Sequence, residues 1–271
     1  MPELPEVETT RLGITPHVIG KTIEDVIIRE RKLRWQVPSR LKTNLVGTQI
    51  HNLARRGKYL VFNTDNGNMI IHLGMSGSLR ILKNTLPPEK HDHLDFVFAS
   101  HTCLRFHDPR RFGCILWTEK DPSQHKLLAH LGPEPLSDEF NGEYLFHKSR
   151  KRSLPVKSFI MDSHIVVGVG NIYANEALFL AGINPKRKAG KITRERYHRL
   201  SHAIKAVLEK ALTKGGTTLR DFVNGEGKPG YFSNELQVYD RENEPCFICN
   251  TPLVMQRIAQ RSAFFCRHCQ S

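Results

Sequence analysis

The start of this 271-residue chain combines a nucleophile with carboxylates. The chain begins MPELPE, and removal of Met1, which is usual before proline, would leave Pro2 as a free secondary amine. An α-amino group has an ordinary pKa near ~8, against ~10.4 for a lysine side chain, so part of it is an unprotonated nucleophile at neutral pH. Proline is also a good first residue of a helix, so the start alone leaves both interpretations open.

A second group is the set of four cysteines near the end of the chain. Cys246 and Cys249 form one C-x2-C pair, sixteen residues separate it from the next, and Cys266 and Cys269 form the second pair. This spacing brings two pairs of thiolates to opposite sides of a tetrahedral metal and predicts one structural zinc ion. Disulfides are the alternative, which a cytosolic chain disfavours.

Four other cysteine and histidine positions are expected to be structural. Cys103 and Cys114 lie in strand-like runs and are predicted to be buried thiols. The run His91-Asp92-His93 could suggest a metal site. Neighbouring positions along a strand point to opposite faces, so these side chains are not expected to share one ion.

Composition indicates a polyanionic partner. The formal charge is +13 with a pI near 9.6, and neutralising phosphates is the main use of such a surplus, so nucleic acid is the first expectation. Hydrophobic residues make up 39% of the chain, no apolar run approaches the ~20 residues that span a bilayer, and the start lacks a secretory pattern. We therefore expect a cytoplasmic protein.

The residue pattern changes midway along the chain and predicts an α+β fold. A helix is expected over residues 4–18, with Pro5 tolerated in its first turn, followed by short strands rich in β-formers up to residue 117. These elements predict a β-sandwich with an N-terminal helix. Helices are then expected over residues 141–152, 155–161, 171–181 and 193–214, and a glycine-rich loop, expected to be mobile, over 224–230.

Three loops carry residues that fit contact with nucleic acid. Gly168-Val169-Gly170-Asn171 is a glycine turn that leads into a helix and can aim backbone N–H groups at a phosphate. Met75 and Phe112 stand at the tips of two tight loops, where a water-facing residue is usual. Together with Arg110 they predict a wedge that enters a base stack and fills the place of an extruded base.

These pieces resemble the bacterial formamidopyrimidine-DNA glycosylases over nearly the whole chain. The matching motifs, in chain order, are PELPE at the start, RGKY at 56–59, HLGMSG at 72–77, DPRRFG at 108–113, GVGNIY at 168–173, KPGYF at 228–232 and the four-cysteine finger. The resemblance implies an N-terminal β-sandwich, a helix-two-turn-helix domain and a β-hairpin zinc finger. The corresponding boundaries are expected at residues 1–131 for the catalytic domain, 132–223 for the helical domain, 224–235 for the linker loop and 236–271 for the finger.

The resemblance also implies a role for individual residues. Pro2 is the nucleophile that attacks C1′ of the damaged nucleotide, Glu3 the acid-base residue, and Glu6 a support for the proline, with Lys58 counted in the same catalytic set. The residues implied to contact DNA are His72, Met75, His93, Arg110, Phe112, Lys157, Asn171, Tyr239 and Arg261. Residues 217–231 are implied to close over the extruded purine.

The implied activity is base-excision repair of oxidised purines such as 8-oxoguanine and formamidopyrimidines. The chain would be a glycosylase and an abasic-site lyase working by β,δ-elimination, with one structural Zn²⁺, acting as a monomer on damaged duplex DNA in the bacterial cytoplasm at the nucleoid. Two alternatives stay open: an endonuclease VIII-type glycosylase for oxidised pyrimidines, and a zinc-finger DNA-binding protein without catalysis.

Overall fold

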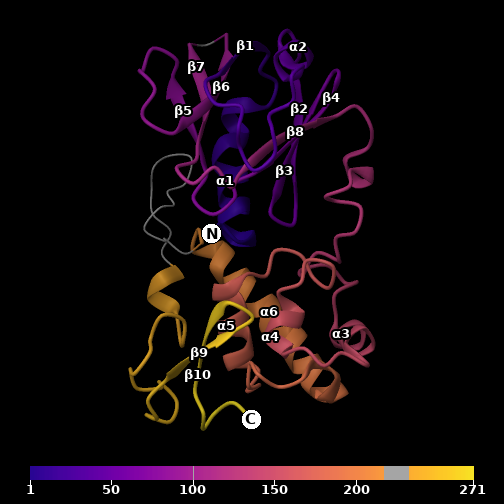
Figure 1. The fold of residues 1–271 in the computed structure, drawn as a ribbon, viewed down its shortest axis with the longest axis vertical. Coiled ribbons are helices and arrows are strands. Elements are labelled where there is room, and N and C mark those ends of the chain that lie inside the picture. The colour runs from indigo at the N-terminus through magenta and orange to yellow at the C-terminus, as the bar shows by residue number, and fades with distance from the viewer. Residues whose placement is uncertain (100, 217–231) are drawn as a thin grey trace. The chain divides into compact units, whose positions relative to one another are not determined.

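The computed structural model describes residues 1–99, 101–216 and 232–271, and the chain divides into two compact units. Unit 1 comprises Met1–Ala129 and Lys214–Tyr231, and unit 2 comprises His130–Thr213 and Phe232–Ser271 (Figure 1). The loop predicted over residues 224–230 and the base-capping role of residues 217–231 lie outside the described residues. Among the helices that the structure describes, none is long and apolar enough to cross a membrane.

Unit 1 begins with helix α1 (Leu4–Val18), which has the predicted bounds. Pro5 lies in the first turn, where its missing N–H costs no helical hydrogen bond. Val7, Ile14 and Val18 are buried and join the core of the unit, so one face of the helix packs inward. Of the predicted catalytic set, Glu6 lies in the first turn of α1, Glu3 is its N-cap and Pro2 comes directly before it, whereas Lys58 lies between two strands further along the chain.

Two four-stranded antiparallel sheets form the rest of unit 1 and confirm the predicted sandwich. The first has the order β1 (Ile23–Ile28), β6 (Asp92–Phe98), β7 (Thr102–His107), β5 (Ser78–Lys83). The second has the order β2 (Ile50–Arg56), β3 (Tyr59–Thr64), β4 (Gly67–His72), β8 (Cys114–Thr118). Side chains from both sheets, such as Phe62 and Phe96, belong to one buried core.

The sequence-based prediction missed three elements of unit 1. Strand β2 reads IHNLARR, and its burial does not alternate, so the period-2 pattern of a half-buried strand is lacking. Helix α2 (Leu41–Leu45) has only five residues, too few to show a helical period, and η1 (Pro122–Gln124) is a single 3₁₀ turn. The predicted buried thiols are confirmed, since Cys103 and Cys114 are 0% and 2% exposed.

Unit 2 holds the predicted helices in slightly shorter form. They are α3 (Gly142–Ser149), α4 (Val156–Ile160), α5 (Asn171–Leu180) and α6 (Arg194–Thr213), with 3₁₀ turns η2 (Ala189–Lys191) and η3 (Phe232–Glu235). Helix α3 ends at Ser149, before its predicted end, because Arg150 has an extended ψ of 141° and Lys151 a left-handed φ of 63°, and a right-handed helix includes neither. Strands β9 (Val254–Ile258) and β10 (Arg261–Phe265) form an antiparallel two-stranded ribbon near the C-terminus (Figure 1).

A buried ion network crosses the β1-β6-β7-β5 sheet. The Arg105 guanidinium, 2% exposed, donates from Nε and Nη2 to the two carboxylate oxygens of Asp95 at 2.8 and 2.9 Å, and Arg29 reaches the same carboxylate at 2.6 Å. Burial raises the pKa of Asp95, but the bonds from Arg29 and Arg105 outweigh it and hold this pKa below its ordinary value. These buried charges are tolerated because the hydrogen-bonding groups of the Arg105 guanidinium and the Asp95 carboxylate all have partners.

Removing one member of this network is expected to destabilise unit 1. In Arg105→Ala, the Asp95 carboxylate stays buried with one of its two cations missing, so the free energy of unfolding should fall by about 3–5 kcal/mol. Urea unfolding followed by the fluorescence of Trp35 and Trp117, the only tryptophans of the chain and both in unit 1, measures this change.

The matched control is Lys42→Ala. Lys42 pairs with Asp25 at 2.6 Å, but both side chains are largely exposed, so the loss should stay below about 1 kcal/mol. Equal losses for the two variants would contradict the expected importance of the buried network.

Candidate active site and nucleic-acid interface

The predicted catalytic carboxylates surround the start of helix α1. Glu3 is 2% exposed and Glu6 is fully buried, and the Glu3 N–H donates to Glu6 Oε2 at 2.8 Å. Pro2, the residue before Glu3, is also buried. The Glu6 carboxylate therefore holds the backbone N–H directly after Pro2 by a hydrogen bond. This bond is consistent with the predicted role of Glu6 in supporting the proline.

A second segment of unit 1 approaches the same carboxylate. Gly216 has a φ of +81°, and a Cβ at this position would lie 3.0 Å from Glu6 Oε1. Glycine at position 216 thus meets two needs at once, a left-handed backbone and a close approach to Glu6.

Lys58 and His72 come together at one end of the second sheet, where β3 begins and β4 ends. Lys58 lies in the turn between β2 and β3, and its neighbour Tyr59 pairs across the strands with His72, their rings 4.7 Å apart. His72 Nδ1 accepts the Gly74 N–H at 2.9 Å, so in the neutral ring the proton must lie on Nε2. His72 can offer a phosphate a neutral N–H donor.

The charge state of His72 follows from its surroundings. Burial, together with the positive charges of Lys58 and Arg34, lowers the pKa of His72 to about 4. The ring is therefore neutral at physiological pH, and the cation of this pair is Lys58.

The two loops of the predicted wedge lie against each other. A Cβ at Gly74 would lie only 2.3 Å from Gly113 N, so the loop that carries Met75 touches the loop that carries Arg110 and Phe112. The Arg110 guanidinium lies 5.0 Å from the centre of the Phe112 ring, and Phe112 is 43% exposed. An exposed aromatic ring beside a cation fits insertion into a base stack.

Asp108 holds both loops in place, a role that the sequence analysis did not assign. Its carboxylate is fully buried and accepts the Ser76 hydroxyl at 3.0 Å, the Gly113 N–H at 2.7 Å and the Arg110 N–H at 3.3 Å. The sequence signal was available, because aspartate before proline commonly starts a turn by bonding to backbone N–H groups ahead of it.

His93 lies under this turn. It is 4% exposed, and its Nε2 lies 2.8 Å from the Asp108 carbonyl oxygen, to which it can donate. This position indicates that His93 orients the Arg110 loop, and its direct contact with DNA stays a prediction.

The neighbouring His91 lies before β6 and has a left-handed φ of 77°. Its ring centre is 6.2 Å from that of His93, so the expectation that neighbouring side chains of this run point to opposite faces does not hold for these two histidines. Among the described residues, the cysteines are the only group of three or more potential ligands close enough to hold a metal.

In unit 2, the glycine turn and the ribbon bring three predicted phosphate contacts onto one scaffold. Asn171 is the first residue of α5, preceded by Gly170 as the N-cap and by Gly168 at a φ of 81°. Lys157 is 1% exposed and its ammonium donates to the Ser262 carbonyl, so it supports the ribbon from below. Arg261, the residue before Ser262, begins β10 and is exposed.

The four cysteines form a cluster suited to one metal ion. Their sulfur atoms all lie within 4.8 Å of one another, with Cys246 to Cys269 at 3.9 Å and Cys249 to Cys266 at 3.5 Å. Four thiolates around a tetrahedral metal at about 2.3 Å stand about 3.8 Å apart, so these separations fit. Hydrogen bonds from Thr251 lower the pKa of Cys249, whereas burial raises the pKa of Cys266 and of Cys269, so a bound cation would be needed to hold all four as thiolates.

Glu176 is a second residue that the sequence analysis missed. Its carboxylate, the only charged side chain of α5, accepts three consecutive backbone N–H groups, from Gln237 at 2.8 Å, Val238 at 3.0 Å and Tyr239 at 2.9 Å. Burial raises the pKa of Glu176, and the three amides only partly offset this. Tyr239, a predicted DNA contact, is thus held through its backbone, while its ring packs on Phe264. The sequence signal for Glu176 was a single acidic residue within a helix whose other side chains are uncharged.

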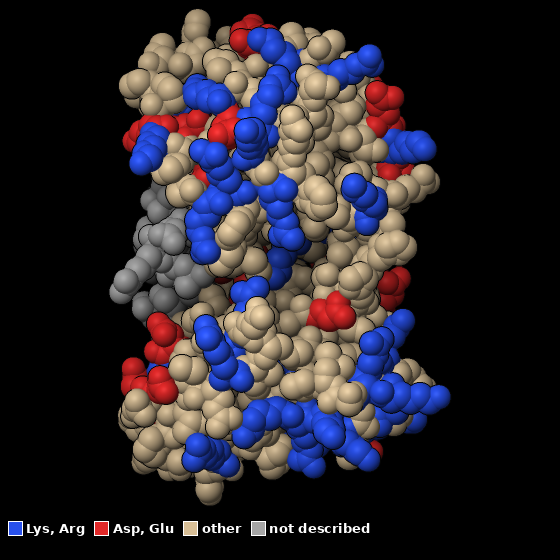
Figure 2. Space-filling view, in the orientation of Figure 1, with Lys and Arg blue, Asp and Glu red and all other residues tan. Residues whose placement is uncertain are grey.

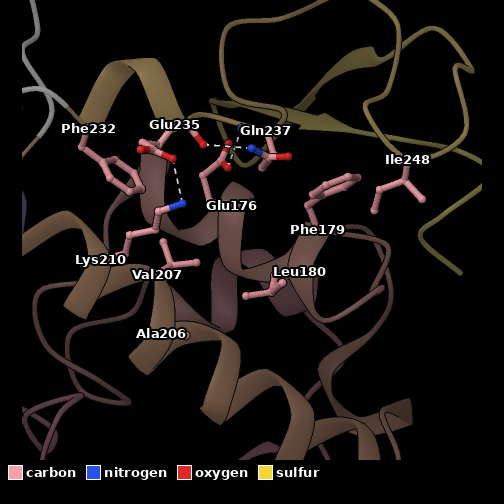
Figure 3. A pocket seen from close by; sticks show the side chains of 10 residues that line it. All are labelled: Glu176, Phe179, Leu180, Ala206, Val207, Lys210, Phe232, Glu235, Gln237 and Ile248. Carbon is pink, nitrogen blue, oxygen red and sulfur yellow. Dashed lines mark hydrogen bonds and ion pairs between the residues drawn. The ribbon is translucent and has the colours of Figure 1, made fainter. Parts of the chain in front are cut away.

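Glu176 also borders a cavity of about 300 Å³ between α5, α6 and η3 (Figure 3). Its walls are mainly apolar, among them Phe179, Val207 and Phe232, and Lys210 pairs with Glu235 at 2.7 Å at its rim. None of the predicted site residues lines it.

Basic side chains are spread over the surface of each unit on the face shown in Figure 2, and acidic ones are fewer there. Within the part of the chain that the structure describes, the predicted residues group locally. Unit 1 holds the α1 start, the Lys58–His72 pair and the two touching loops, whereas unit 2 holds Asn171, the ribbon and the cysteine cluster.

Family models match most of the chain. The formamidopyrimidine-DNA glycosylase N-terminal domain matches residues 1–115, and the H2TH domain of the same enzymes matches residues 131–223. The chain belongs to the formamidopyrimidine-DNA glycosylase family. The predicted resemblance is thereby confirmed.

Curated relatives and solved structures agree with this family. The formamidopyrimidine-DNA glycosylases of Teredinibacter turnerae and Marinobacter nauticus are 59% and 57% identical over 272 and 270 residues, with full coverage of both chains. The MutM (Fpg) crystal structure from Thermus thermophilus matches at 38% identity with a TM-score of 0.89, covering 99% of this chain and 98% of its own. A Lactococcus lactis Fpg variant, in complex with DNA containing Fapy-dG, matches at 34% identity and a TM-score of 0.92, with full coverage of both.

The low pKa of His72 predicts how the stability of unit 1 depends on pH. The ring stays neutral in the folded chain down to about pH 4 but takes up a proton near pH 6.5 once unfolded, so acid favours the unfolded chain. Stability should fall by about 1–2 kcal/mol between about pH 7 and about pH 5, and this contribution should level off below about pH 4.

His72→Gln provides the comparison, because glutamine does not titrate. Urea unfolding at a series of pH values should show a shallower acid loss in the variant than in the native chain. The same dependence of stability on pH in both chains would contradict the neutral state assigned to His72 in the folded chain.

Proposed function

We infer that this chain removes oxidised purines from duplex DNA and then cuts the strand at the abasic site. The observation that carries this inference is the buried Pro2-Glu3 pair at the start of α1, held by Glu6, in a chain of this family. The substrates would be 8-oxoguanine and formamidopyrimidines. Related structures support that class, since one relative is described with DNA containing Fapy-dG and another with carbocyclic 8-oxo-G.

The chemistry follows from the secondary amine. After loss of Met1, the Pro2 nitrogen forms a bond to C1′ and loses its N–H proton, while the bond from C1′ to the base breaks and the base leaves with that proton. Glu3 protonates the sugar ring oxygen, so the ring opens and a cationic iminium links Pro2 to C1′. The cation acidifies the C2′ hydrogen, and successive β- and δ-eliminations release the two flanking phosphates.

Other predicted residues would hold the DNA. Lys58, His72, Asn171 and Arg261 would bind phosphates around the extruded nucleotide. Further contacts would come from Tyr239, from Lys157 below the ribbon that carries Arg261, and from His93 below the loop that carries Arg110. Met75, Arg110 and Phe112 would fill the space that the extruded base leaves in the duplex. Such contacts position the DNA without reading its sequence.

The cysteine cluster would hold one structural Zn²⁺ that keeps the β9–β10 ribbon in shape. The zinc supplies four bonds in place of a larger apolar core. We also propose the four-part division at residues 131/132, 223/224 and 235/236, and action as a monomer on the chromosome in the cytoplasm.

Borohydride trapping tests nucleophile and substrate together. Protein lacking Met1, mixed with a duplex containing 8-oxoguanine opposite cytosine and reduced with borohydride, should give a covalent adduct on its N-terminal peptide, because reduction converts the iminium to a stable amine. Mass spectrometry of the digested adduct identifies the attached residue.

Two comparisons define the outcome. A Pro2→Gly variant that cuts as fast as the native chain would remove Pro2 as the nucleophile. Preferential trapping on an oxidised-pyrimidine duplex would favour the endonuclease VIII-type activity, and binding without any adduct would favour a DNA-binding protein without catalysis.

Metal content tests the zinc site. Native protein should carry one zinc ion per chain, and Cys246→Ser should lose it and bind duplex DNA at least about tenfold more weakly, because the finger no longer folds. Cys103→Ala is the control, since this buried thiol lies in β7 and should leave the zinc in place. A full zinc complement in Cys246→Ser would argue against the site.

A further inference from the structure

The outer edge of strand β10 is hydrogen-bonded to side chains instead of to another strand. Among the residues that the structure describes, the ribbon consists of β9 and β10 alone, so no strand there pairs with the outer edge of β10. Two of these groups, the Ser262 carbonyl and the Phe264 N–H, instead bond to side chains of α4 and α5.

Asn175 on α5 makes the central bond. It is 1% exposed, its Oδ1 accepts the Phe264 N–H at 2.9 Å, and its Nδ2 lies 3.5 Å from the Ser262 carbonyl. Lys157 donates to that same carbonyl. The two side chains thus bond to the Ser262 carbonyl and the Phe264 N–H, which a third strand would otherwise use.

The same amide also reaches the glycine turn. Asn175 Nδ2 donates to the Asn171 carbonyl at 2.6 Å, one helical turn earlier on α5. One buried side chain therefore links the residue that begins α5 with the strand that begins at Arg261.

We propose that Asn175 is a positioning residue that docks the β10 edge on α5 and so places Arg261 and Asn171 for joint phosphate binding. This inference rests on the proposed function, which assigns phosphate contacts to Arg261 and Asn171. Asn175 itself touches no DNA, and it acts by keeping the ribbon from shifting along the helix.

Binding to an uncleavable duplex measures this role. With a tetrahydrofuran abasic analogue opposite cytosine, Asn175→Ala should raise Kd about tenfold and lower the slope of log K against log salt by about 1, as the loss of one phosphate contact would. In an Arg261→Ala background, Asn175→Ala should change Kd by less than about twofold, because the contact it positions is already gone.

A conservative variant separates positioning from stability. Asn175→Asp keeps the acceptor for the Phe264 N–H but loses the donor to the Asn171 and Ser262 carbonyls, so its Kd and salt slope should lie between those of Asn175→Ala and of the native chain. Ser201→Ala is the matched control, because Ser201 is equally buried in α6 and bonds only to the His198 carbonyl. It should leave Kd unchanged.

Hydrogen exchange of the native chain tests the contact without a variant. The Phe264 amide lies on an open strand edge, so its slow exchange in the absence of DNA would support the contact with Asn175, and rapid exchange would overturn it. A native Kd in Asn175→Ala, an undiminished effect in the Arg261→Ala background, or a folded Asn175→Asp that binds no better than Asn175→Ala would also overturn it. If the native chain does not prefer the abasic-analogue duplex over an undamaged one, the proposed function fails together with this inference. If it does prefer that duplex, the variants test positioning alone.

Discussion

A buried backbone N–H group without an acceptor costs about 1–3 kcal/mol, and the loops that carry the functional residues have few strand or helix partners to supply one. Buried carboxylates meet this need in three places. Glu6 accepts the N–H of Glu3, Asp108 accepts those of Arg110 and Gly113, and Glu176 accepts three consecutive N–H groups of residues 237–239. Each carboxylate thus holds one functional segment to the packed core of its unit.

This arrangement explains why exposed residues can act from defined positions. Phe112 and Arg110 project into solvent, yet the loop below them is fixed through Asp108 and His93. In unit 2, Asn175 and Lys157 do the same for the ribbon through its backbone. Ordering these loops before DNA arrives reduces the entropy that binding must otherwise remove.

Charge is divided between recognition and structure. The surplus of +13 favours a polyanion, but several arginines are committed inside, as Arg105 is with Asp95. His72 contributes no charge at neutral pH, because burial and nearby cations lower its pKa, so the salt dependence of binding should reflect lysine and arginine contacts rather than histidine.

The sequence by itself determined the α1 helix, most strands of the sandwich, the four helices of unit 2 and the cysteine cluster, because hydrophobic period, turn residues and ligand spacing are local signals. It failed for β2 and α2, whose patterns are too short or irregular. Local signals marked Asp108 and Glu176, but only the tertiary structure decided that these residues and Asn175 support the candidate site, and that His93 is buried beneath a loop. Their partners lie up to 89 residues away in the chain, and no local pattern records a hydrogen bond formed across that separation.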